Sequence, residues 1–266
     1  MDDETLDHIV PAETGDGSTT LIDQRREISY RSQHGAIQES KHVFLEGTGI
    51  VDRNGPWRVV ELGFGAAVNF VQTVRAFRDD FSALRLIYHS IDWRPVTSEH
   101  LAFHGHEESA DKGDDEQPDP ENEAAEMARS AVDAIHGGDG PVTTVESEDG
   151  KIVLHLHARP WEDAKLTGIG AHAFYHDPFS KRINPESWTA ASFVRAKKAM
   201  APDGRLATYS AATSVKEAMF EAGLWVASAP GPGRKREMTV ASPSRAVLER
   251  AADLEMLDRA KYLGES

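Results

Sequence analysis

Asp177 is the residue of this chain whose position most directly suggests chemistry. It follows a run rich in apolar residues at 171–176, which predicts a buried strand, and Pro178 and Phe179 come next. An acid at the carboxyl end of a parallel strand lies in the crevice where open α/β sheets bind ligands. Such a carboxylate could orient an amine or accept its proton. The alternative is an ordinary aspartate that caps a strand.

A second group of residues is typical of a cofactor turn. The sequence Glu61-Leu62-Gly63-Phe64-Gly65 stands between a predicted strand and a predicted helix. Glycines let a backbone approach a ligand closely, and a helix N-terminus favours negative charge. The pattern lacks the third glycine of the dinucleotide fingerprint and the lysine of a phosphate-binding loop. It is therefore weak evidence alone, and a simple tight turn is the alternative.

Asp92 strengthens the interpretation, because it ends the next predicted strand, where a carboxylate can accept hydrogen bonds from both hydroxyls of a ribose. This arrangement would serve a nicotinamide dinucleotide or S-adenosylmethionine alike. A solvated acid is the bland alternative.

The predicted elements explain how these residues could meet. Strands at 57–62, 83–93, 171–179 and 204–210 alternate with helices at 68–81, 122–135, 185–200 and 211–223. Segments 142–145 and 152–157 look like a hairpin or two separate strands. This alternation predicts a mostly parallel sheet with helices on both faces. Strands at 225–229 and 237–241 are joined by a loop too short for a parallel crossover, so they are expected to pair antiparallel. The resulting α/β plan resembles the Rossmann-like class I S-adenosylmethionine-dependent methyltransferases.

Composition restricts the function classes. The chain has 266 residues, a formal net charge of −15 and no cysteine, which excludes disulfides and thiolate chemistry. The acidic balance argues against non-specific coating of nucleic acid or DNA binding, but leaves room for a local basic patch. We find no membrane-length apolar run, no basic-then-apolar leader and no histidine spacing typical of a metal site. We therefore expect a cytoplasmic protein without metal or membrane partner.

Four stretches together resemble one family. They are residues 34–44 (HGAIQESKHVF), 61–65 (ELGFG), 177–180 with Asn184, Pro185 and Trp188, and 233–238 (GRKREM). In order and spacing they resemble the tRNA wobble-uridine methyltransferases of MnmD type, which are equivalent to the methyltransferase half of bifunctional MnmC. The resemblance covers about residues 28–242. It is to the stand-alone form, since the chain has no room for the flavin oxidase domain.

The resemblance implies S-adenosyl-L-methionine as cofactor and methyl transfer to the aminomethyl group of 5-aminomethyl-(2-thio)uridine at the wobble position of the tRNA anticodon. It places these residues at the cofactor: Glu39, Ser40, Glu61, Gly63, Phe64, Gly65, Asn69, Asp92, His157 and Asp177. The catalytic group would be Asp177, Phe179 and Lys181, and the RNA-binding group Asn184, Trp188, Arg234, Lys235 and Arg236.

Two departures from the family pattern concern the cofactor. Ala66-Ala67 replaces the usual Thr-Gly after the glycine turn, so an extra methyl group could reduce affinity. Leu156-His157 stands where the family has Gly-Asp near the adenine, and His157 is the candidate replacement. A structural histidine is the alternative.

The resemblance also divides the chain. Residues 1–27 are expected to form a partly disordered tail or a loose strand, 28–243 the methyltransferase domain with an acidic flexible loop at 104–123, and 244–266 a C-terminal helix.

Several alternatives stay open. Trp188 could be a core aromatic instead of a stacking platform for a base, Lys181 a solvated charge, and residues 234–236 an ordinary charged loop. The protein could also methylate a small-molecule amine, or be a non-catalytic binding module that has lost the cofactor. A nicotinamide oxidoreductase fits worst, and the sequence does not indicate the oligomeric state.

Overall fold

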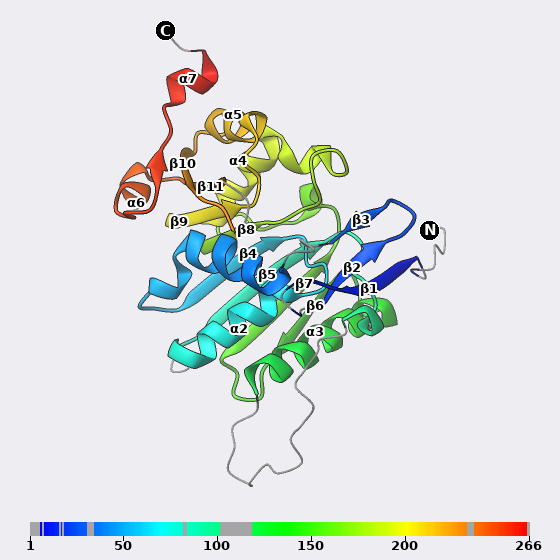
Figure 1. Ribbon diagram of the computed structural model, residues 1–266. Coiled ribbons are helices and arrows are strands. Elements are labelled where there is room, and N and C mark those ends of the chain that lie inside the picture. The colour runs from blue at the N-terminus through cyan, green and yellow to red at the C-terminus, as the bar shows by residue number, and fades with distance from the viewer. Residues whose placement is uncertain are drawn as a thin grey trace.

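A nine-stranded sheet forms the centre of the described part of the chain (Figure 1). The computed structural model describes residues 6, 8–15, 17, 19–30, 35–81, 84–101, 119–232 and 237–264. The sheet order is β12-β10-β11-β9-β8-β4-β5-β7-β6. Its strands are β4 (Trp57–Leu62), β5 (Leu86–Asp92), β6 (Val142–Glu146), β7 (Ile152–Ala158), β8 (Ala171–His176), β9 (Met200–Thr208), β10 (Trp225–Pro230), β11 (Glu237–Ser242) and β12 (Glu255–Met256).

The topology confirms the predicted α/β methyltransferase plan. Strands β4, β5, β7, β8 and β9 pair in parallel, and β6 pairs antiparallel with β7. β10 and β11 form the predicted antiparallel hairpin, in which Trp225 pairs with Ser242 and Pro230 with Glu237. β11 lies between β10 and β9 and runs antiparallel to both. β10 therefore runs parallel to β9, and its carboxyl end lies at the same sheet edge as those of the parallel strands.

Helices bury both faces of this sheet (Figure 1). One apolar cluster joins the strands to α2 (Val68–Phe81), α3 (Pro120–Gly137) and the π-helix η1 (Ser40–Glu46), which follows α1 (Ala36–Glu39). The other joins them to α4 (Ala190–Ala199) and α5 (Thr213–Glu221). Because β4 is covered on both sides, five of its six residues are buried, as in a central parallel strand. Short 3-10 turns complete the helices: η2 (Ile50–Asp52), η3 (Ser98–His100), η4 (Trp161–Asp163) and η5 (Pro185–Trp188).

The segment 1–27, expected as a tail or loose strand, forms strands in its described part. β1 (Ile9–Glu13), β2 (Thr19–Asp23) and β3 (Ile28–Ser29) form a separate antiparallel sheet (Figure 1). Ile9 is 5% exposed and Leu21 is fully buried, both within the larger apolar cluster. A few isolated apolar residues that pack against a distant core leave no periodic signal, so local patterning missed the sheet.

The C-terminal helix predicted for 244–266 is wrong. The described segment consists of α6 (Arg245–Glu249), the short strand β12 and α7 (Arg259–Leu263). β12 extends the sheet at β10, where Ala227 pairs with Met256. Pairing with β10 and the packing of Met256 against the core therefore interrupt the helix that the charged segment was expected to form.

Two other boundaries differ from the prediction. Most of the acidic segment 104–123 lies outside the described residues, and α3 begins at Pro120, where the Asp119 side chain accepts a hydrogen bond from the Glu121 N–H. The helix predicted at 185–200 is divided into η5 and α4, because Thr189 caps α4 through the N–H of Ser192. Among the described helices, none has the length and apolar character needed to cross a bilayer.

Candidate active site

The glycine turn and Asp177 lie side by side at the carboxyl edge of the sheet. The N–H of Gly63 donates to the carbonyl of Ile91 (2.8 Å), and the N–H of Asp177 donates to the carbonyl of Leu62 (3.0 Å). Gly63 has φ +100°, and a Cβ there would lie 2.5 Å from the Asp177 carbonyl oxygen. The close approach therefore requires glycine and brings the turn next to the candidate catalytic acid.

Asp177 is held by a buried hydrogen-bond network. The Asn69 Nδ2 donates to Asp177 Oδ2 (3.0 Å) and to Glu61 Oε1 (2.8 Å). The Ser90 hydroxyl donates to Glu61 Oε2 (2.7 Å). Glu61 and Asn69 are fully buried, whereas Asp177 is half-buried. The network therefore orients the carboxylate from behind, as expected for a preorganised site.

This network bears on the roles that were predicted for Glu61 and Asn69. Both were predicted at the cofactor, but Glu61 is enclosed behind Asn69 and both of its oxygens accept hydrogen bonds. Asn69 Oδ1 is buried without a hydrogen-bond partner among the described residues. It is the atom of the network that still needs a donor, because a buried unpaired acceptor is costly.

Asp92 ends β5 on the other side of the glycine turn. Its Oδ2 accepts from the N–H of Gly65 (3.1 Å) and its Oδ1 from the N–H of Arg94 (3.0 Å). Burial raises the pKa of Asp92, and these N–H donors partly offset the rise. The Asp92 carboxylate is thus held beside the glycine turn by backbone N–H groups, as expected from its position at the end of a strand.

Tyr30, which the sequence did not indicate, brings the N-terminal sheet into the site. Its ring meets Phe179 edge-on, with 4.9 Å between centroids, and its Cδ1 lies 3.4 Å from the Cβ position of Gly65. Burial and the charge of Asp92 raise the pKa of the Tyr30 hydroxyl. Tyr30 therefore forms a wall between the glycine turn and Phe179.

Tyr209 is a second residue missed from the sequence. It directly follows β9, and its hydroxyl donates to the Pro178 carbonyl (2.9 Å). The rule that singled out Asp177, a functional group at the carboxyl end of a parallel strand, would also have found it. Tyr30 had no such signal.

Trp188 is a structural residue in this arrangement. It is 2% exposed, and its indole N–H donates to the Phe179 carbonyl (2.9 Å). The rings of His176 and Tyr209 pack against it with centroids at 4.8 and 5.8 Å. This burial favours the alternative of a core aromatic residue, and stacking of Trp188 on a base stays a prediction. Phe179 is half-buried and keeps that possibility.

Comparison with known proteins places these features in a family. Residues 122–244 match a protein-family model described as S-adenosyl-L-methionine-dependent methyltransferase. A Ralstonia nicotianae protein named tRNA 5-methylaminomethyl-2-thiouridine biosynthesis bifunctional protein MnmC is 33% identical over 231 residues, which are 84% of this chain and 33% of that protein. A Leptospira borgpetersenii protein of the same name is 27% identical and covers 82% of this chain and 33% of its own length. This chain belongs to the S-adenosyl-L-methionine-dependent methyltransferases.

A solved structure supports the fold separately. The crystal structure of MNMC2 from Aquifex aeolicus superposes with a TM-score of 0.68 at 24% identity, and the match covers 89% of this chain and 70% of that one. The chain spans about a third of the length of the curated relatives it matches.

The methyltransferase cofactor fits the residues around the glycine turn. Gly63 and Gly65 both have positive φ and leave backbone without side chains at the sheet edge. Asp92 offers a fixed carboxylate for hydroxyl groups, and Asn69 Oδ1 lacks a donor. This donor and acceptor set suits a ribose and an amino acid moiety, so S-adenosylmethionine would be held by Asp92, the glycine turn and Asn69.

Phe64 and Ala67 contribute less than the family pattern implies. Phe64 is 1% exposed and packs near Phe70 in the core, so only its backbone lies in the turn. Ala67 has φ +60° and is fully buried in the same cluster. Its methyl group packs into the core, and its cost is backbone strain of about 1–2 kcal/mol.

His157 belongs to a histidine cluster on the sheet. Its Nε2 lies 3.2 Å from Nδ1 of His89, whose ring stacks on His155 at 4.4 Å. Burial and neighbouring histidines lower the pKa of His89 to about 3, and burial and His155 lower that of His157 to about 4. These rings are therefore neutral near pH 7. The described contacts do not join His157 to the glycine turn, and its adenine role stays a prediction.

The other predicted site residues are either described by their contacts below or lie outside the described residues. Glu39 is 7% exposed and Ser40 fully buried at the junction of α1 and η1. Lys181 is exposed and its Nζ donates to the Ser214 hydroxyl (3.1 Å), whereas the Asn184 Nδ2 donates to Glu186 (3.2 Å). Arg234, Lys235 and Arg236 lie outside the described residues. The described residues hold no cluster of three or more His, Cys, Asp or Glu suited to a metal.

The burial of Trp188 leads to a test that separates it from Phe179. Trp188→Phe should lower the free energy of unfolding by about 1–3 kcal/mol, because it removes the hydrogen bond to the Phe179 carbonyl and leaves a cavity. Phe179→Leu should leave stability nearly unchanged and raise the KM for the methyl acceptor. Urea unfolding and steady-state kinetics measure both. A stable Trp188→Phe protein with a raised KM would support the stacking role.

Proposed function

We propose that this protein transfers a methyl group from S-adenosylmethionine to the aminomethyl group of 5-aminomethyl-(2-thio)uridine at the wobble position of a tRNA anticodon. The observation that carries the proposal is the half-buried Asp177 carboxylate, oriented by Asn69 directly beside the glycine turn. The relatives named for biosynthesis of 5-methylaminomethyl-2-thiouridine supply the substrate class.

The residue types suit methylation of an amine. S-adenosylmethionine, when bound, supplies a methyl group on an already activated sulfonium, so the protein needs chiefly to position the acceptor. The attacking amine must be neutral. Asp177 can accept a hydrogen bond from it, orient its lone pair, and take up a proton directly or through water. Asn69 keeps the carboxylate in place during this step.

The surroundings of Asp177 suit a nucleoside as acceptor. A base in an anticodon loop must leave its stack to enter a pocket, and aromatic rings stabilise an extruded base. Phe179, two residues after Asp177, and Tyr30 offer such rings at the site. Lys181, two residues after Phe179, is an exposed cation that could contact a phosphate.

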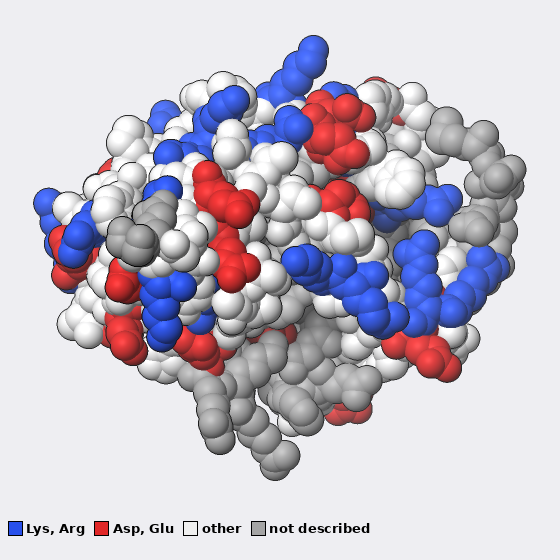
Figure 2. All heavy atoms as spheres, turned by 90° about the horizontal axis from the view of Figure 1, so that it is seen from above, with Lys and Arg blue, Asp and Glu red and all other residues white. Residues whose placement is uncertain are grey.

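The charge distribution allows an RNA partner despite the net charge of −15. Figure 2 shows Lys and Arg side chains gathered in a band beside a hollow on one face, with acidic side chains in separate groups. Concentrated cations on an acidic protein favour a local phosphate contact over general nucleic-acid binding. We propose that the enzyme acts in the cytoplasm on tRNA. We further propose that it binds the anticodon stem-loop of that tRNA.

The decisive experiment uses labelled S-adenosylmethionine and tRNA from cells that lack this modification. Nucleoside analysis should find the label in the 5-methylaminomethyl nucleoside. Label that enters small amines but not tRNA would favour a different N-methyltransferase. Absence of binding heat and of a thermal shift with S-adenosylmethionine would favour a non-catalytic module.

A further inference from the structure

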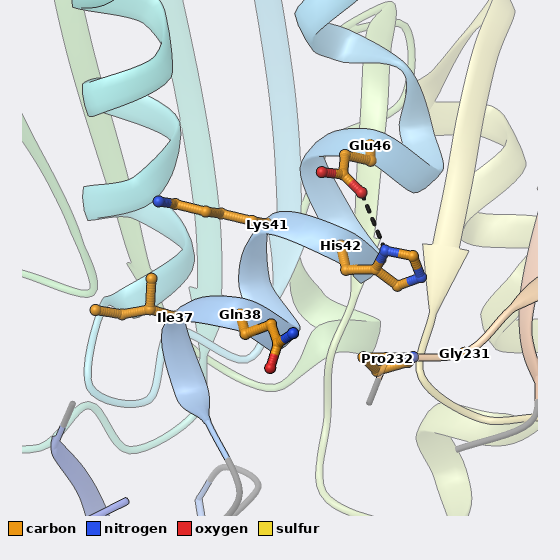
Figure 3. Close-up of a pocket in the computed structure, with 7 residues that line it drawn as sticks. All are labelled: Ile37, Gln38, Lys41, His42, Glu46, Gly231 and Pro232. Atoms are coloured by element: carbon orange, nitrogen blue, oxygen red, sulfur yellow. Dashed lines mark hydrogen bonds and ion pairs between the residues drawn. The ribbon is translucent and has the colours of Figure 1, made fainter. Parts of the chain in front are cut away.

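An open groove lies alongside the helical segment formed by α1 and η1. It is lined by Ile37, Gln38, Lys41, His42, Glu46, Gly231 and Pro232. We call it the α1–η1 groove. Figure 3 shows that these residues come from two segments far apart in sequence, the α1–η1 helix and the chain that follows β10. None of the residues that line this groove was described above as part of the candidate active site.

His42 joins the two walls of the groove. Its Nε2 lies 2.9 Å from the Pro230 carbonyl oxygen, and its Nδ1 lies 3.0 Å from Glu46 Oε2 (Figure 3). Both neighbours are oxygen atoms, so the imidazole ring bridges η1 and the end of β10. The contact also engages Glu46, the one acid of the lining. The groove is therefore built by specific contacts and its carboxylate is paired.

The groove lies at the same sheet edge as Asp177. β8 ends directly before Asp177 and β10 ends directly before Gly231, and both strands point toward this edge. The sheet order β8-β9-β11-β10 separates them by three strand spacings, or about 14 Å. A loop of RNA that places one nucleoside at Asp177 would reach the groove with a nucleotide nearby in the chain.

The lining chemistry suits a sugar-phosphate unit. Lys41 is half-buried and no salt bridge joins it to a described carboxylate. Figure 3 shows its side chain extending from the α1–η1 helix toward α2, on the side away from Gly231 and Pro232. Gln38 is an exposed amide, and Ile37 and Pro232 add apolar surface. Phosphate oxygens are bound by Lys, amide donors and backbone N–H groups, and such contacts fix the register of a nucleic acid.

We infer that the α1–η1 groove binds a backbone phosphate of the single-stranded RNA loop whose modified nucleoside enters the site at Asp177. The inference rests on the proposed function for its substrate class. The groove would act as a register contact that holds the loop while the nucleoside is extruded, and it would not take part in methyl transfer itself.

The test compares Lys41→Gln and Lys41→Glu with Lys198→Gln. Lys198 is an exposed lysine at the end of α4, which leads into the amino end of β9, so it lies at the opposite sheet edge. Anisotropy titrations use a labelled, unmodified anticodon stem-loop RNA at several KCl concentrations. Lys41→Gln should weaken binding about 3–10-fold and reduce the salt slope by about one, with a larger loss for Lys41→Glu. Lys198→Gln should match the parent protein.

The outcomes separate this inference from the proposed function. Affinity for S-adenosylmethionine should be equal in all variants. Unchanged RNA affinity and slope in both Lys41 variants, or an equal loss in Lys198→Gln, would overturn the groove assignment even if the parent protein methylates tRNA. Loss of RNA binding in the Lys41 variants combined with no methylation by the parent protein would overturn the proposed reaction and leave the groove in place.

Discussion

Asp177→Asn should lower the rate of methyl transfer about 10²–10⁴-fold and leave the affinity for S-adenosylmethionine close to that of the parent protein. An asparagine oxygen can still accept the hydrogen bond from Asn69 Nδ2, so the geometry of the network is retained. The substitution removes the charge and the capacity to take up a proton. Single-turnover kinetics and calorimetry with S-adenosylmethionine measure the two effects separately.

Two comparisons make the Asp177 result specific. Asn69→Leu keeps the carboxylate but removes its buried donor, so it should reduce turnover less than Asp177→Asn while also destabilising Glu61, which loses a hydrogen bond. Asp133→Asn changes an exposed acid of α3 and should have no effect. If Asp177→Asn turned over at the parent rate, Asp177 would have no part in catalysis.

The parts of the site that the sequence indicated share one property. Gly63, Asp92 and Asp177 each stand at the end of a strand with strong apolar patterning, and parallel strands bring their carboxyl ends together. The hairpin of β10 and β11 could also be predicted from the sequence, because its connection is too short for a parallel crossover. Local pattern and chain connectivity therefore sufficed for the sheet, the glycine turn and the acid beside it.

The rest depends on contacts between segments that are distant in the chain. Tyr30, which directly follows the two-residue strand β3, contacts Phe179 although the two residues are far apart in the chain. The burial of Trp188 follows from its neighbours His176 and Tyr209, which lie on other elements. Whether an aromatic residue near a helix start is a ligand platform or a core residue is decided by such packing, and residue type alone does not distinguish the two.

Gly63 is required by the fold and also positions the candidate catalytic acid. Its φ is positive, and the Asp177 carbonyl leaves no room for a side chain at this position. Gly63→Ala should lower the free energy of unfolding by about 2–4 kcal/mol, from strain at positive φ and from overpacking against the backbone. Relief of the contact would displace Asp177 from Asn69, so turnover should fall even in the folded fraction. Urea unfolding and single-turnover rates below the transition measure both effects.

Gly140→Ala is the matched control for this change. Gly140 has φ +112°, close to the +100° of Gly63, but a Cβ there would meet nothing within 4 Å. Its substitution therefore carries the backbone strain without the contact, and it should cost about 1–2 kcal/mol with full activity. The difference between the two variants isolates the approach of the glycine turn to Asp177. Equal destabilisation and equal activity in both would show that this approach contributes neither to stability nor to the geometry of the acid.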